Sequence, residues 1–115
     1  MIFHLVPLAD WSAAPSGLPF APSSLAAEGF VHCSADRATV LGIAGSHYRE
    51  VPGVLLVLEL DEAALTSEVR RAGGPGDPYP HVYGPLDREA VVAVWEVVRG
   101  PGGAARELVS RPSGR

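Results

Sequence analysis

The sequence predicts an α+β fold built from small mixed or antiparallel sheets with one main helix. Five or six short β-prone segments are separated by Gly- and Pro-rich turns, whereas only residues 35–48 keep apolar side chains at helical spacing over any length. A third observation is the long apolar run Val54–Leu60, which is typical of a strand covered on both faces. We therefore place this run at the centre of the sheet.

The remaining elements follow from local signals along the chain. Strands are expected at residues 2–6, 30–33, 54–60, 68–71, 81–83 and 91–98. Short helical turns are expected at residues 10–14, 22–29 and 61–65, with Asp10 as the N-cap of the first and Gly29 as the stop of the second. Ser34 is the expected N-cap of the main helix, and residues 72–80 form a loop.

A chain of 115 residues corresponds to one domain. We expect residues 1–98 to form a single globular domain. Residues 99–115, rich in Gly, Pro and Arg, are expected to be a flexible tail because they offer little apolar surface for packing.

Charge and composition exclude several classes of function. The formal net charge is −4, and residues 99–115 carry four arginines against one glutamate, so the acidic charge lies on residues 1–98. An acidic body without a basic stripe argues against strong nucleic-acid binding, which depends on Lys and Arg at the phosphates. The chain has no lysine, which excludes Schiff-base chemistry and a phosphate-loop lysine.

The cellular location is predicted from the lack of a membrane span and of a signal peptide in the sequence. No apolar run approaches the ~20 residues that a membrane span needs, and the first residues lack the basic region and cleavage site of a signal peptide. The single cysteine, Cys33, excludes an intramolecular disulfide. We therefore expect a cytoplasmic protein without a membrane segment, and the sequence makes no prediction of oligomeric state.

The stretch EGFVHCS, residues 28–34, places a histidine, a cysteine and a serine in succession. Strand alternation puts His32 and Ser34 on one side and Cys33 on the other, so a Cys-His nucleophile pair is disfavoured and Cys33 is expected to be buried. No CxxC, HxxxH or HExxH spacing is present, so no metal site is predicted. Ligand binding by His32 is the preferred interpretation.

Other polar groups share faces with apolar strand residues. His4 is either a ligand-binding residue or a core histidine bonded to a carbonyl, and Ser34 is either an anion-binding group at a helix N-terminus or a simple cap. His81 and Tyr83 share a side next to a rigid turn, which suits a binding site, although a tyrosine can also close a turn. His47 is expected to be structural or at the surface.

Four ordered motifs resemble the small bacterial family called domain of unknown function 952: FHLVPLADW, APSSLAAEGFVHCS, VLLVLELDEAAL and YPHVYGPLDREAVVAVWEV. The resemblance covers about residues 2–98. It implies a fold related to the ADP-ribosyltransferase-like superfamily, whose members bind NAD in a cleft between two small sheets.

The same resemblance implies roles for individual residues. His4 would hold a nucleotide ribose, and His32 or Ser34 would lie near the nicotinamide ribose. By residue type alone, Tyr83 or Tyr48 could stack on the ligand. The pattern departs where related sequences carry V-R-W-E, since this chain has Val69–Ala72 (VRRA) and so lacks an acid at that place.

The resulting hypothesis is an NAD- or nucleotide-binding, ADP-ribosyltransferase-like enzyme. Its catalytic residues would be His32 and His81, and its cofactor-binding residues His4, His32, Ser34 and Tyr83, with NAD as cofactor. The alternative is a non-catalytic module that binds a small molecule in a cleft shaped by the same histidines.

Overall fold

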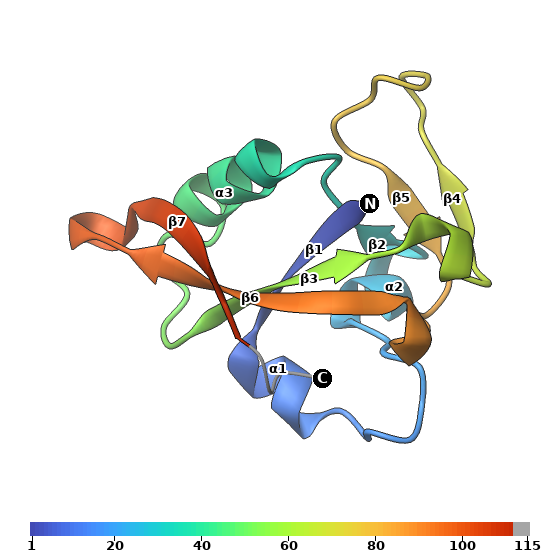
Figure 1. Cartoon of the computed structure of the whole chain (residues 1–115), viewed down its shortest axis with the longest axis horizontal. Helices are drawn as coiled ribbons and strands as arrows, with labels where there is room; N and C mark the ends of the chain where they lie inside the picture. The colour runs from blue at the N-terminus through green and yellow to red at the C-terminus, as the bar shows by residue number, and fades with distance from the viewer. Residues whose placement is uncertain (112–115) are drawn as a thin grey trace.

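Two antiparallel sheets form the framework of the computed structural model, which describes residues 1–111 (Figure 1). The larger sheet has the strand order β1-β3-β6-β7 and contains β1 (Ile2–Pro7), β3 (Leu55–Leu60), β6 (Val91–Arg99) and β7 (Ala105–Ser110). β3 pairs with β1 on one side and with β6 on the other. This interior position confirms the expectation drawn from its apolar run.

The smaller sheet has the order β2-β5-β4, formed by β2 (Val31–His32), β5 (His81–Tyr83) and β4 (Glu68–Arg70). It is joined to the edge of the larger sheet by one antiparallel bridge between Phe3 and Ser34. An α+β architecture with antiparallel sheets is therefore confirmed.

Helical segments are short apart from α3. They are α1 (Leu8–Ala13), α2 (Ser23–Glu28), α3 (Arg37–Ser46), and the 3-10 turns η1 (Glu62–Ala64), η2 (Arg88–Ala90) and η3 (Pro101–Gly103). The predicted stop at Gly29 is confirmed, since this residue takes the left-handed conformation with φ of 87°. Within residues 1–111 no helix has the length and apolar character needed to cross a membrane.

Two of the expected helix caps are wrong. The main helix is capped by Asp36, whose side chain accepts a hydrogen bond from the Thr39 N–H at 2.8 Å, and Ser34 does not cap it. Ser34 is unavailable because its backbone pairs with Phe3. The first helix begins at Leu8, after Pro7, so the expected cap Asp10 lies inside its first turn.

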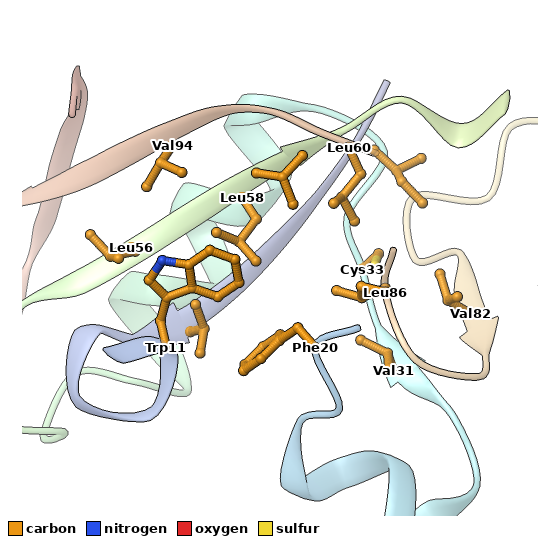
Figure 2. Packing of buried hydrophobic residues seen from close by; sticks show 13 residues of the cluster. Trp11, Phe20, Val31, Cys33, Leu56, Leu58, Leu60, Val82, Leu86 and Val94 are labelled. Carbon is orange, nitrogen blue, oxygen red and sulfur yellow. The ribbon is translucent and has the colours of Figure 1, made fainter. Parts of the chain in front are cut away.

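Apolar residues pack on both faces of the larger sheet. One cluster fills the space between this sheet, the smaller sheet and α1, where Trp11 and Phe20 meet Leu56, Leu58 and Leu60 (Figure 2). The second cluster lies under α3. It contains alternating residues of β1 and β3 and two residues of α3: Phe3, Leu5, Leu55, Val57, Val40 and Ala44. Alternation along β1 and β3 thus divides their side chains between two cores.

The expected flexible tail is wrong for residues 99–110. β7 pairs with β6 over Trp95–Arg99 (Figure 1). Leu108 packs against the cluster under α3. Gly103 serves a tight turn, because its φ is 80° and a Cβ there would clash with the Arg49 carbonyl oxygen. The final part of the expected tail, residues 112–115, lies outside the described residues.

Arg99 gives the first testable prediction. Its guanidinium donates hydrogen bonds to four backbone carbonyls, those of Tyr48, Arg49, Val51 and Gly53, over distances of 2.6 to 3.3 Å. Lysine cannot reproduce this planar fork, so Arg99→Lys should lower the free energy of unfolding by about 1–2 kcal/mol in urea denaturation.

The matched control is Arg106→Lys, because Arg106 is exposed on neighbouring β7 and makes no such set of bonds. Equal stability of the two variants would show that Arg99 does not hold the 48–53 segment in place.

Candidate functional site

A cleft of about 640 Å³ opens beside β1, between α3 and the smaller sheet, and all four histidines of the chain line it. His4 comes from β1, His32 from β2, His81 from β5, and His47 from the C-cap of α3. The cleft has the volume usual for small-molecule sites.

His4 is the buried member of this set, with 6% of its surface exposed. Its Nδ1 lies 2.7 Å from the His32 carbonyl oxygen. A carbonyl only accepts, so Nδ1 carries the hydrogen and Nε2 is left with a free lone pair. Burial lowers the pKa of His4 to about 4, despite the opposing effect of the His32 carbonyl, so the ring is neutral at pH 7.

His32 is exposed and paired with a carboxylate. Its Nε2 lies 2.9 Å from Oε2 of Glu28, the last residue of α2. Gly29, in the left-handed conformation, ends α2 between the two residues. An ionised carboxylate only accepts, so Nε2 carries the hydrogen and Nδ1 has the free lone pair.

His81 lies directly opposite His32 in the β2–β5 pair, and the two ring centroids are 5.5 Å apart. The His81 ring is also stacked on Phe30, with centroids 4.0 Å apart and an interplanar angle of 13°. Sheet register and this stacking together hold His81 at the wall of the cleft.

The serine and cysteine next to His32 are both buried. Ser34 is 4% exposed and lines the cleft, and its N–H donates to the Phe3 carbonyl at 2.7 Å. The Cys33 side chain packs in the core cluster with Val31 and Leu60, which confirms its expected burial (Figure 2). Burial raises the pKa of the Cys33 thiol to about 12, with a smaller contribution from Glu62, so a reactive thiolate is disfavoured.

Tyr83 is the one predicted site residue that does not line the cleft. It lies on the outer face of the smaller sheet, where the Arg70 guanidinium is 4.3 Å from its ring centroid. Strand alternation correctly puts Tyr83 on the same side as His81, but the cleft reaches only the His81 end of β5.

Other lining residues were absent from the predicted set. Glu28, Tyr79 and Ser24 line the cleft, as do Tyr48, considered only for stacking, and His47, expected to be structural. The spacing of four residues between Glu28 and His32 was the available signal for their contact. Burial raises the pKa of Tyr48, so its hydroxyl keeps its proton.

The charge of the lining restricts what the cleft can hold. Among residues 1–111 the lining contains Glu28 as its one carboxylate and no Lys or Arg. Within the same described part of the chain no group of three His, Cys, Asp or Glu residues could hold a metal ion. Imidazole nitrogens, hydroxyls and tyrosine rings therefore provide most of the polar contacts for a ligand.

The buried His4 predicts a pH dependence of stability. The unfolded chain binds a proton on His4 below about pH 6.5, whereas the folded chain binds it only below about pH 4, so stability present above pH 6.5 is lost as the pH falls through this window. The contribution of His4 to this loss should be roughly 3 kcal/mol. It is measured by urea denaturation of the wild type and His4→Gln between pH 7 and pH 4.

Glutamine can still donate to the His32 carbonyl but does not titrate, so the pH slope of His4→Gln should be smaller. His47→Gln, at a side chain next to exposed Ser46, should keep the wild-type slope. A His4→Gln slope equal to that of the wild type would mean that His4 is not the titrating group.

Comparison with known proteins identifies relatives by fold and by family. The crystal structure of protein CC0527 from Caulobacter crescentus is similar to this chain, with a TM-score of 0.75, 23% sequence identity and coverage of 91% of this chain and 92% of that chain. A double mutant of the same protein gives a TM-score of 0.75 with 22% identity and the same coverage. At such identity the likeness establishes a shared fold alone.

No curated protein matches the sequence. A family model does match it, over residues 5–94, which is well over half of the chain. The chain therefore belongs to the family described as Protein of unknown function (DUF952).

Proposed function

We propose that this protein binds NAD or a related nucleotide in the histidine-lined cleft and acts as an ADP-ribosyltransferase-like enzyme. The observation that carries the proposal is the meeting of His4, His32 and His81, from three different strands, in one cleft of about 640 Å³. Two of these rings each have one nitrogen engaged within the protein and one nitrogen free.

Free imidazole nitrogens suit the recognition of ribose hydroxyls. The neutral ring of His4 offers Nε2 as an acceptor, and its burial keeps it neutral over the physiological pH range. A hydroxyl donates readily to such a nitrogen, whereas a phosphate oxygen cannot. The ribose nearest the nicotinamide is therefore the proposed partner of His4, with Ser34 beside it.

The charge of the cleft selects which end of the ligand enters. The oxidised nicotinamide ring is planar and positively charged, and it would find Tyr48 and Tyr79 as aromatic neighbours and Glu28 as a carboxylate. The pyrophosphate is anionic and has no Lys or Arg to meet it among the described lining residues. We infer that the nicotinamide riboside end lies inside and that the phosphates lie at the solvent-exposed mouth.

A second candidate function is a non-catalytic module that binds the same class of ligand. It is favoured by the absence of an acid from the stretch Val69–Ala72, where the family resemblance implies one. The nearest strand glutamate, Glu68, is exposed and bonded to Arg70, so it does not replace that acid in the cleft. Binding without turnover would favour this candidate.

Isothermal titration with three ligands tests the binding proposal. NAD and nicotinamide riboside should bind with dissociation constants within about threefold of each other, because the phosphates make few contacts. ADP-ribose should bind at least about tenfold more weakly, a difference of about 1.4 kcal/mol, because it lacks the charged ring. Absence of heat with NAD and nicotinamide riboside alike would refute the proposal.

A pair of variants on β5 tests the location. His81→Ala should weaken NAD binding by about tenfold, because it removes a wall of the cleft. Tyr83→Ala, two residues further along the same strand and outside the lining, should leave the dissociation constant within about twofold. Equal effects of the two substitutions, with both proteins folded by circular dichroism, would place the ligand elsewhere.

A further inference from the structure

The contact between Glu28 and His32 is the closest pairing of a carboxylate with an imidazole in the cleft. Their Oε2 and Nε2 atoms are 2.9 Å apart, and both residues line the cleft. The two side chains are about half exposed, with 51% and 54% of their surfaces accessible, so the pair contributes little to stability. Because both residues line the cleft, the pair can act on a molecule bound there.

Hydrogen bonding defines the state of the His32 ring. The carboxylate of Glu28 requires the hydrogen on Nε2, which leaves Nδ1 as the basic nitrogen. Within residues 1–111, Nδ1 has no hydrogen-bond partner in the protein. A carboxylate that orients an imidazole and stabilises its protonated form is the arrangement used by general bases in hydrolytic enzymes.

We propose that Glu28 and His32 form a general-base pair that activates water for hydrolysis of an N-ribosyl bond in the cleft, with His32 as the base and Glu28 as the positioning residue. This inference rests on the proposed function, because it requires a ligand with a charged nicotinamide ring attached to ribose.

The reaction balances without a further reactant. A water molecule gives one proton to His32 Nδ1, and its oxygen forms a bond to the anomeric carbon of the ribose. The carbon–nitrogen bond breaks, and its electron pair goes to the pyridine nitrogen, so nicotinamide leaves as a neutral molecule. Glu28 stabilises the imidazolium, which then releases the proton to solvent. For NAD the products are ADP-ribose, nicotinamide and one proton.

The other candidate groups of the cleft are unsuited to this role. Burial lowers the pKa of His4 to about 4, which makes it too weak a base, and burial raises the pKa of Cys33 to about 12, which keeps its thiol protonated. His81 stacks on Phe30, and among residues 1–111 it interacts with the Asp77 carboxylate through charge without a hydrogen bond to it. His47 Nδ1 is already bonded to Ser46 Oγ at 3.0 Å.

Three groups set the electrostatic surroundings of His32. They are Glu28 on α2 at 2.9 Å, the His81 ring on β5 with its centroid 5.5 Å away, and His4 on β1, which interacts with His32 through charge. Of these, only the carboxylate favours the imidazolium. Its removal should therefore slow the step in which His32 takes a proton from water.

The experiment measures nicotinamide release from NAD by the full chain and, separately, NAD binding by calorimetry. His32→Gln should abolish release. Glu28→Gln should lower kcat, measured at saturating NAD, by at least about tenfold, and this loss is separate from the weaker NAD binding expected once no carboxylate faces the charged ring. Glu28→Asp, which keeps a carboxylate, should restore part of the rate.

The matched control is Glu68→Gln, because Glu68 is also an exposed glutamate 2.9 Å from a basic side chain but lies outside the cleft. It should keep the wild-type rate. NAD binding without nicotinamide release by the wild type would overturn the general-base inference and leave the proposed binding intact. Release that is unchanged in Glu28→Gln and His32→Gln would also overturn it. Absence of NAD binding would refute the proposed function and this inference with it.

Discussion

The joint between the two sheets is the interaction on which the site depends. Phe3 exchanges two backbone hydrogen bonds with Ser34, at 2.7 and 2.9 Å, and the neighbouring His4 ring donates to the His32 carbonyl at 2.7 Å. Consecutive residues of β1 therefore hold the end of β2 through both backbone and side chain. Because β2 in turn pairs with β5, this joint also positions His81 relative to His4.

Local patterns were sufficient to predict most of the fold. The apolar run of residues 54–60 predicted β3, and Gly29 predicted the end of α2. Strand alternation predicted that Cys33 is buried in the core. The errors arose where distant contacts decide the outcome. Residues 105–110 resemble a polar tail in composition, yet β6 offers them a partner strand and the layer under α3 accepts Leu108. Ser34 is a suitable cap by residue type, but its pairing with Phe3 leaves that role to Asp36.

The site was predictable only in part, because its geometry comes from the order of strands in two sheets. Strand faces identified His4, His32 and His81 as candidates, but nothing local specifies that β1, β2 and β5 meet at one cleft. The same reasoning selected Tyr83, which has the correct face but lies beyond the end of the cleft. Glu28, in contrast, was not predicted although it lines the cleft. Its spacing of four residues from His32 could be read from the sequence, but the contact between them depends on where α2 ends.

The difference in burial between His4 and His32 gives these two histidines different chemical properties. The joint between the sheets encloses His4, so its charged form is disfavoured and its free nitrogen can only accept a hydrogen bond. His32 begins at the same joint, since its carbonyl is the acceptor for His4, yet its ring extends into solvent toward Glu28. A neutral acceptor at the base of the cleft and a carboxylate-paired imidazole at its wall together favour a ligand that presents hydroxyls inward and positive charge toward Glu28. The same arrangement disfavours an inward phosphate, because it would meet a carboxylate where phosphate-binding sites place arginine or lysine.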